Sequence, residues 1–445
     1  MFRLFGYFCF ALFLLITSLS CDSSEPPPVV PPPDLRKITL SVEDVSCTEV
    51  WLSIKTDSIT FPSEIILLKD TVAQAISLCC SDTVLYIDSL LPNKPHNYKA
   101  ILTTDTTIKS ETVTAQTLDT TSHNFTWQSW EFGEHSSSVL YDVAIIDENN
   151  IWAVGEIYMN DSLGNPDPHA YNAAHWDGSQ WELKRIMFYT ICGQQNLSSY
   201  PARSIQIFNE NDIWIGVDGD QITRIENGVQ TTTICLPWSF TINKIWGTSS
   251  EDLYVVGNGG NIAHYSGVSG GWQKIESGTE LNINDIWGDY NDKTGEWEIL
   301  AVAANIFQGF DKEVLKITND NVEILNKNGI EEPLFGIWFI PNRKYYLVGS
   351  GTYEKFKLHQ NIWKGDPLDI TSYFENKIKG QDVNDVFIAG AFGEFLHFNG
   401  ISWKSYMNQI GLTNGAYLSV DARNKLVATT GYEGIQAKII IGQKY

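Results

Sequence analysis

Residues 385–403 decide the fold. They begin with Asp385-Val386-Phe387-Ile388-Ala389-Gly390 and continue to His397-Phe398-Asn399-Gly400-Ile401-Ser402-Trp403. The first run is apolar and ends in a small residue, which is typical of a buried strand. An Asn-Gly pair between two apolar runs indicates a tight hairpin turn, so two more strands are expected around Asn399 and Gly400.

The same pattern recurs through residues 150–445. Clear copies of the first run are Ile151-Trp152-Ala153-Val154-Gly155, Asp212-Ile213-Trp214-Ile215-Gly216 and Asp252-Leu253-Tyr254-Val255-Val256-Gly257, and weaker copies end at Ala303, Gly349 and Gly431. Consecutive markers are 41 or 46 residues apart, except that 61 residues separate Gly155 from Gly216. The extra residues of the first unit are therefore expected in loops.

A period of about 40 residues in strand-rich units predicts a β-propeller, because only neighbouring units can cover the faces of each sheet. Each unit is interpreted as four antiparallel strands, so the fold class expected for the chain is all-β. Fourteen of the 15 tryptophans lie from Trp127 onward, where aromatic side chains can fill the contacts between sheets. The repeats favour seven blades, with six and eight as the alternatives.

The last repeat lacks a strand. Three strands are expected at 416–422, 425–430 and 434–441, after which the sequence ends. The segment Asn124-Phe125-Thr126-Trp127-Gln128-Ser129-Trp130-Glu131-Phe132-Gly133 has the spacing of a fourth strand. We expect it to complete the last sheet of a propeller at 123–445 and to remove two open edges.

Residues 1–20 are interpreted as an export signal, since the apolar run from Leu4 to Leu19 is too short to span a bilayer. The segment resembles a bacterial lipoprotein signal, which implies lipid attachment at Cys21 and an outer-membrane or cell-surface location. Ser18 and Ser20 also fit ordinary secretion. Two Pro-Pro-Pro runs within 21–34 predict an extended stalk.

Residues 35–118 show the alternation of a separate β-sandwich. Leu90-Leu91-Pro92, then Tyr98-Lys99-Ala100-Ile101 and the final run Thr112-Val113-Thr114-Ala115-Gln116-Thr117-Leu118, resemble the end of a fibronectin type III domain. The resemblance implies a tyrosine corner, in which the Tyr98 hydroxyl bonds an upstream backbone group. Trp51 is expected in the core of this sandwich.

The net charge and the cysteines limit the possible partners and disulfides of the protein. The chain has 30 Lys and Arg against 53 Asp and Glu, a net charge of −23, so nucleic acid is an unfavourable partner. In an exported protein disulfides can form, and the pairs considered are Cys192 with Cys235 and Cys47 with Cys79 or Cys80. No zinc-type CxxC spacing is present.

Candidate chemical residues mostly indicate structural roles. His175, His264 and His397 occupy one slot of different repeats, which favours hydrogen bonding over a shared metal site. Asp212, Asp252, Asp285 and Asp385 recur just before or within strands, which favours turn or strand-entry capping over catalysis. No nucleophile motif, phosphate loop or metal site is found, and no cofactor is expected.

The first unit carries the candidate ligand site. It is enlarged between the second and third strands (156–172) and again before the next unit (188–201). In a propeller both connections lie on one face, here called the top face. The expected ligand-binding residues are Tyr158, Asp161, Asp167, His169, Tyr171, Tyr189 and Tyr200. Asn160, Asp161, Asn165 and Asp167 also offer oxygens to a calcium ion.

Three functions remain open. The preferred one is a non-catalytic binding module, anchored to the envelope through its lipid, whose top face recognises a glycan or protein. The alternative is a periplasmic scaffold that assists assembly of envelope complexes. The third is an enzyme acting on extracellular polysaccharide, with Asp161 and Asp167 as the acidic pair to test.

Overall fold

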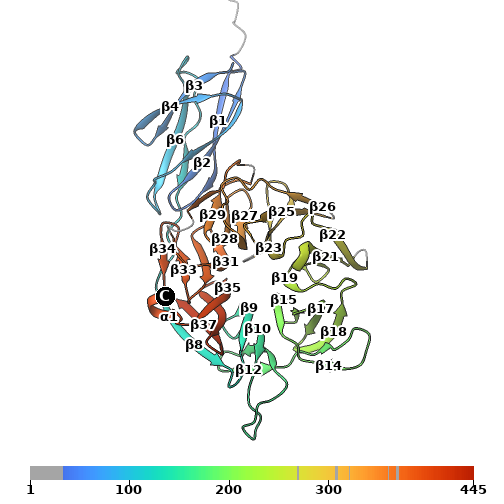
Figure 1. Ribbon diagram of the computed structural model, residues 1–445. Coiled ribbons are helices and arrows are strands. Elements are labelled where there is room, and N and C mark those ends of the chain that lie inside the picture. Colours follow the sequence, from blue (N-terminus) through green and yellow to red (C-terminus); the bar gives the residue numbers. More distant parts are fainter. Residues whose placement is uncertain (1–33, 268–269, 306–308, 320, 359, 367–369) are drawn as a thin grey trace, which may run out of the picture.

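The computed structural model describes residues 34–445 except 268–269, 306–308, 320, 359 and 367–369 (Figure 1). The predicted signal at 1–20, the lipid-attachment residue Cys21 and nearly all of the stalk at 21–34 lie outside the described residues. No helix in the described part is long and apolar enough to cross a bilayer.

The N-terminal region is a sandwich of two antiparallel sheets. One has the order β1 (Lys37–Val45), β2 (Val50–Asp57), β5 (Asp82–Ile87). The other has the order β4 (Val72–Leu78), β3 (Ser63–Lys69), β6 (Pro95–Leu102), β7 (Val113–Gln116). Alternate residues of both sheets, such as Leu52, Ile65 and Ala100, meet in one buried core.

Two predictions for this sandwich are wrong. Trp51 is buried, but the alternation of β2 points Val50, Leu52 and Ile54 into the core and leaves Trp51 on the opposite side of its sheet. There its ring lies 5.7 Å from Phe356 of the C-terminal region. The tyrosine corner also does not form, because the buried Tyr98 hydroxyl has no hydrogen-bond partner among the described residues.

Seven further four-stranded sheets follow among the described residues. In the first three, the order is β9 (Val139–Asp147), β10 (Asn150–Ile157), β11 (Tyr171–Trp176), β12 (Trp181–Lys184); then β15 (Ala202–Asn209), β16 (Asp212–Val217), β17 (Gln221–Glu226), β18 (Val229–Cys235); then β19 (Ile242–Ser249), β20 (Asp252–Gly257), β21 (Asn261–Ser266), β22 (Gly271–Glu276).

The next three are β23 (Ile283–Asn291), β24 (Glu296–Ala304), β25 (Lys312–Thr318), β26 (Asn321–Ile324); then β27 (Leu334–Ile340), β28 (Lys344–Gly349), β29 (Thr352–Lys355), β30 (Lys364–Asp366); then β31 (Glu375–Asp382), β32 (Asp385–Gly390), β33 (Phe395–Phe398), β34 (Trp403–Ser405). The last consists of β35 (Gly415–Arg423), β36 (Leu426–Glu433), β37 (Gln436–Lys444) and β8 (Phe125–Phe132). Short elements are β13 (Phe188–Tyr189), β14 (Leu197–Ser198), the 3-10 turn η1 (Asn258–Gly260) and α1 (Met407–Ile410).

The seven sheets form a closed ring (Figure 1). The first strand of each sheet packs on the first strand of the next, in the order β9, β15, β19, β23, β27, β31, β35, and β35 returns to β9. Each first strand therefore lines the central axis. This is the arrangement of a β-propeller.

The strand predicted to close the ring is found where expected. β8 pairs antiparallel with β37, from Phe125 opposite Lys444 to Phe132 opposite Ala437. Phe125 stacks on Trp127 with ring centroids 5.2 Å apart, and both pack into the core of the last sheet. The two ends of the propeller thus share one sheet, and neither β8 nor β37 lies unpaired along this edge.

One predicted disulfide is present and the other is not. Cys192 is bonded to Cys235. Cys47 is instead buried as a free thiol that bonds the Asp119 carbonyl oxygen at 3.1 Å, while Cys79 and Cys80 are free and exposed. The Cys47 pairing was wrong because this side chain faces the propeller, where its sulfur lies against Gly400.

Candidate binding face

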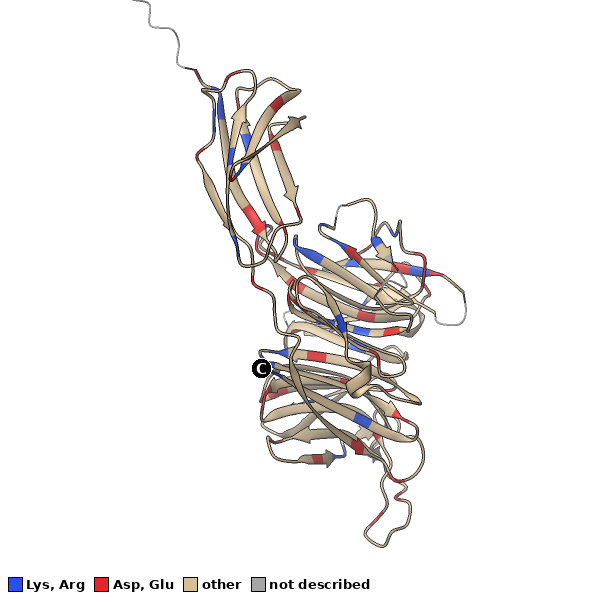
Figure 2. Cartoon of the chain, turned by 90° about the vertical axis from the view of Figure 1, so that its left-hand side faces the viewer, with Lys and Arg blue, Asp and Glu red and all other residues tan. Residues whose placement is uncertain are grey.

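The ring has two distinct faces. The top face carries the connections that follow each second strand and precede each first strand. The opposite face carries the hairpins between first and second strands. The N-terminal sandwich stands at the rim of the ring on this side, where it contacts hairpins of the fifth and sixth sheets (Figure 2). Arg343, between β27 and β28, bonds Asp44 at 2.8 Å and the Val45 carbonyl at 2.9 Å. The top face is consequently left open.

The first insertion, at 158–170, is an ordered loop. One Asp161 oxygen accepts the backbone N–H groups of Leu163 and Asn165, each at 2.9 Å, so this side chain builds the turn. Asp167 pairs with Arg185 at 2.5 Å, and the Arg185 guanidinium lies 4.0 Å from the centre of the Tyr171 ring. The hydrogen bond from the His169 backbone N–H, and to a lesser extent the Arg185 guanidinium, favour the ionised carboxylate and lower the pKa of Asp167.

His169 is exposed and contributes its backbone carbonyl, which accepts from Arg185 at 2.8 Å. The two acids proposed as an enzymatic pair thus have different partners. No group of three or more His, Cys, Asp or Glu side chains in the described residues is arranged to hold a metal ion. Calcium binding at this loop stays a prediction.

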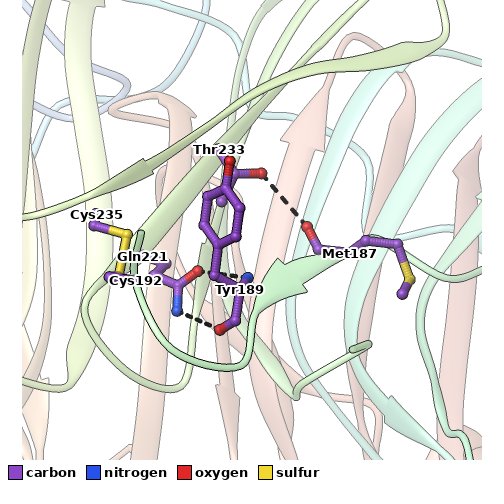
Figure 3. The surroundings of a disulfide bond; sticks show 6 residues. All are labelled: Met187, Tyr189, Cys192, Gln221, Thr233 and Cys235. Carbon is purple, nitrogen blue, oxygen red and sulfur yellow. Dashed lines mark hydrogen bonds between the residues drawn. A yellow bond between two sulfur atoms is a disulfide. The ribbon is translucent and has the colours of Figure 1, made fainter. Parts of the chain in front are cut away.

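The second insertion, at 187–201, folds as the hairpin of β13 and β14. Its tip is fixed to the second sheet, because Cys192 is bonded to Cys235 at the end of β18 (Figure 3). The Gln221 side chain accepts the Tyr189 backbone N–H at 2.9 Å and donates to the Tyr189 carbonyl at 2.8 Å. The disulfide and the two hydrogen bonds with Gln221 therefore hold this connection in one conformation.

Polar contacts join the two insertions. Asn172 is buried and donates to the carbonyl oxygens of Ile186 and Tyr200, at 2.8 and 2.7 Å. The Ser199 hydroxyl donates to the Ala170 carbonyl at 2.6 Å. Tyr171 and Tyr200 are half-buried against the cores of the first and second sheets, so both contribute to folding.

Tyr158 belongs to a chain of contacts that leads inward. Its hydroxyl donates to Glu156 at 2.8 Å, and the other Glu156 oxygen accepts from Tyr141 at 3.0 Å. The Arg203 guanidinium lies 4.0 Å from the centre of the Tyr141 ring. Burial and the Glu156 carboxylate raise the pKa of Tyr158. The outer insertion is thus connected to the centre of the top face.

A ring of bulged residues surrounds that centre. The register of every first strand shifts by one residue near its start, at equivalent positions of all seven sheets. Bulges redirect side chains and are common beside functional sites. The residues at the shifts are Tyr141, Arg203, Asn243, Asn284, Phe335, Asn376 and Leu418, and all line a cavity of about 500 Å³, here called the top mouth.

Several polar side chains of the top mouth already form hydrogen bonds within the protein. Asn284 donates to the Ala304 and Leu334 carbonyls at 3.0 and 2.9 Å, so its amide group can only accept from a ligand. Arg203 bonds Asp218 at 3.0 Å through one terminal nitrogen. Its Nε is buried and has no hydrogen-bond partner among the described residues. The sequence gives little indication that these residues line a cavity, because the bulges become visible only when the strands are paired in the structure.

The floor of the top mouth is an axial network of charges one residue further along the first strands. Asp142 bonds Lys244, Ser204 and Ser419, and Asp285 bonds Lys377. Burial opposes ionisation of Asp142, but Lys244 and Lys377 outweigh it and hold the pKa of Asp142 below its usual value. Asp285 therefore belongs to the axis and not to a strand entry, which corrects its grouping with Asp212, Asp252 and Asp385.

The histidines of the repeats have structural partners. His264 bonds Asp252 at 2.7 Å and His397 bonds Asp385 at 2.8 Å, while His175 bonds Asn150 at 3.0 Å. Each ring also stacks on the aromatic residue paired with it on the second strand: Trp152, Tyr254 and Phe387. In the second sheet Arg224 takes the same slot and bonds Asp212 at 2.7 Å. Side chains distributed around the ring in this way cannot converge on one metal.

The architecture is shared with solved structures of low sequence identity. No protein-family model and no curated protein matches the sequence. YCF48 bound to a D1 peptide is 16% identical with a TM-score of 0.52, and the match covers 74% of this chain and 100% of that chain. YCF48 from Cyanidioschyzon merolae is 12% identical with a TM-score of 0.50, covering 72% and 98%.

The WD40 β-propeller domain of Doa1 is 10% identical with a TM-score of 0.51, covering 71% of this chain and 97% of that chain. At these identities the likeness establishes the fold. The C-terminal region is a β-propeller of the kind found in WD40 and YCF48 structures.

Proposed function

We propose that this protein is a non-catalytic binding module that holds an extended segment of a partner protein in the top mouth. The observation that carries the proposal is Arg203, whose buried Nε has no hydrogen-bond partner within the described part of the chain. Arg203 lines a cavity whose rim is rich in asparagine amides and aromatic rings and whose floor is the axial network of charges. Guanidinium and amide groups are suited to peptide carbonyls and carboxylates, and the bulged aromatic residues Tyr141 and Phe335 offer apolar contact.

The surrounding geometry supports the same proposal. The sandwich docks at the rim of the opposite face, so it leaves the top mouth accessible to a partner. The insertions of the first sheet stand beside it and are already ordered, which reduces the conformational entropy lost on binding. A solved structure of similar fold, YCF48, was determined with a D1 peptide bound. A glycan, which the sequence analysis also considered as a ligand, is the competing hypothesis in the test.

The test compares peptides and glycans on the same protein. A phage-displayed library of random peptides and a glycan array are each screened against the full exported chain. We expect enriched peptides whose affinity falls about tenfold or more in Arg203→Gln and Phe335→Ala, which corresponds to about 1.4 kcal/mol or more. Trp297→Ala, on the opposite face, is the control. Binding of glycans alone, or of peptides insensitive to both top-mouth variants, contradicts the proposal.

We further infer the organisation of the whole chain. The seven sheets are taken as seven blades at 123–445, and the two-sheet domain at 35–118 as a fibronectin type III-like sandwich, since its strand order β1-β2-β5 and β4-β3-β6-β7 supports that assignment. Residues 1–20 are taken as the export signal and Cys21 as the lipid-bearing residue of an outer-membrane or surface lipoprotein.

Location is tested separately from binding. Labelling with a palmitate analogue should mark the wild-type protein and not Cys21→Ser. Protease treatment of intact cells should release the propeller if it is displayed outside. Protection together with labelling would favour the periplasmic scaffold.

A further inference from the structure

A second cavity lies on the opposite face of the ring, around the same axis. It has a volume of about 440 Å³ and is here called the lower mouth. The axial network of Asp142, Lys244, Asp285 and Lys377 separates it from the top mouth. The docked sandwich contacts this face at Lys293 and Arg343, and none of the residues lining the lower mouth comes from the sandwich.

The wall of the lower mouth breaks the symmetry of the repeats. Two residues beyond the axial network, the equivalent positions of the seven first strands are Ala144, Gln206, Trp246, Trp287, Trp338, Lys379 and Asp421. The third, fourth and fifth sheets thus carry tryptophan: Trp246 and Trp287 line the cavity, and Trp338 is buried between sheets. The first two sheets carry smaller residues. This difference leaves the cavity open on the side of Ala144 and aromatic on the other.

The aromatic side is held in place. The Trp287 indole donates to the Phe339 carbonyl at 3.1 Å, and the Lys379 ammonium lies 3.8 Å from the centre of its ring. The Trp246 ring occupies the space a side chain at Gly288 would need, since a Cβ there would lie 2.4 Å from it. Trp297 meets Trp246 edge-on at 5.8 Å and is 45% exposed, so its ring forms the rim.

The polar groups of the lower mouth balance in charge. Lys244, Lys377, Lys379 and Arg423 are matched by Asp142, Asp289 and Asp421 in the lining and by Asp285 beneath Lys377. Lys379 is only loosely paired with Asp421, at 3.7 Å. The Asp289 carboxylate accepts a hydrogen bond from the backbone N–H of Tyr290 at 2.9 Å. Burial raises the pKa of Asp289, which indicates that nearby cations compensate its charge poorly.

We propose that the lower mouth binds a single neutral sugar ring. A sugar places an apolar face on an indole and presents hydroxyl groups that donate to carboxylates and accept from ammonium or guanidinium groups. An anion would meet the carboxylates of Asp289 and Asp421, and a cation would meet Lys379 and Arg423, so the balanced wall favours a neutral polar ligand over either. The volume lies within the range of small-ligand sites, about 300 to 1,000 Å³. This site is independent of the protein-binding role assigned to the top mouth.

The probes are methyl glycosides of glucose, galactose, mannose and N-acetylglucosamine, titrated into the full chain. Tryptophan fluorescence and calorimetry report binding. We expect saturable binding of at least one glycoside, abolished in Ala144→Phe, which fills the open side, and weakened about tenfold or more in Asp289→Asn and Trp297→Ala. Circular dichroism establishes that each variant is folded, and Asp289→Asn decides the outcome if Ala144→Phe is not.

Inorganic phosphate and tetramethylammonium serve as charged probes, and Arg203→Gln in the top mouth is the matched control. Arg203→Gln should leave glycoside binding unchanged. Binding of a charged probe in place of every glycoside overturns the proposal, as does binding of no glycoside, or glycoside binding that is lost in Arg203→Gln and kept in Asp289→Asn.

Discussion

At the level of single residues, several repeats share a polar contact between the second and third strands, although different residue types form it. In the first, second, third, fifth and sixth sheets, the first residue of the second strand bonds a side chain on the third strand, and an aromatic ring lies beside the pair. In the fifth sheet the charges are reversed, with Lys344 bonded to Glu354 at 2.6 Å and lying 5.2 Å from the centre of the Tyr346 ring. In these five sheets the position therefore carries a polar pair across the strands, whatever the sign of its charges.

Asp385→Ala should be the most destabilising change in these pairs. Asp385 is buried and bonds both His397, which is fully buried, and the Lys444 ammonium. Its removal leaves buried polar groups without a partner, and we expect a loss of about 3–5 kcal/mol in the free energy of unfolding. Urea denaturation measures the loss. Asp252→Ala, in the more exposed pair with His264, is the comparison and should cost about 1 kcal/mol; equal losses would contradict this account.

Glu375 should make stability depend on pH. Burial, with a smaller contribution from the Glu394 carboxylate, raises the pKa of Glu375 to about 8, although Thr352 donates to it at 2.8 Å and opposes the shift. Above the ordinary pKa of 4.5 the unfolded chain releases this proton and the native state keeps it. The group therefore lowers stability by up to about 1.4 kcal/mol per pH unit as the pH rises towards 8. Glu375→Gln does not titrate.

The measurement is the urea midpoint of both proteins at several pH values between about 5 and 8. We expect the advantage of Glu375→Gln to grow with pH. Parallel pH profiles would show that Glu375 does not titrate in this range in the native state.

At the scale of elements, β8 decides whether the ring closes. A chain beginning at residue 134 lacks β8, and its β37 then presents an open edge that can pair with another molecule. We expect that chain to associate and a chain beginning at residue 122 to remain monomeric and cooperative. Sedimentation velocity distinguishes the two, and a monomeric, folded chain from residue 134 would contradict a closing role for β8.

The disulfide should hold the β13–β14 hairpin to the second sheet. It closes a loop between positions 43 residues apart, for which a stabilisation of about 2–4 kcal/mol is typical. Replacing Cys192 and Cys235 by alanine should speed protease cleavage of the hairpin near residues 190–197. Reductant should have the same effect on the wild type and none on the variant; unchanged cleavage would mean that Gln221 and packing suffice.

At the scale of the molecule, Arg343 joins the sandwich to the propeller. It bonds Asp44 and Val45 of the sandwich and Asp382 of the ring, and the rings of Trp51, Tyr86 and Phe356 pack beside it. Arg343→Ala should cost about 1–3 kcal/mol at this interface and increase cleavage of the connection at 118–124. Lys55→Ala removes an exposed pair within the sandwich and should change nothing. Equal cleavage of the two variants would contradict the anchoring role.

The sequence could predict on which face of the ring the insertions lie, because residues inserted into a regular repeat form loops. Tyr158, Asp161, Asp167, His169, Tyr171, Tyr189 and Tyr200 lie in the two insertions or at their ends, as the numbering required. Their partners could not be foreseen. Asp161 builds its own turn and Asp167 is paired with Arg185, while the top mouth depends on bulges produced when seven strands meet at one axis.

The repeats and the strand that closes the ring could be predicted from the amino-acid sequence, because hairpins and alternating burial are local patterns that each unit carries in full. The sequence also predicted the sandwich before the ring, through the same alternation. Three outcomes depend on how the chain folds in three dimensions: Trp51 faces the propeller, Asp285 belongs to the axis, and Cys47 stays a free thiol. These outcomes depend on which of two buried environments a strand face meets, and alternation along one strand does not distinguish a domain core from a domain interface.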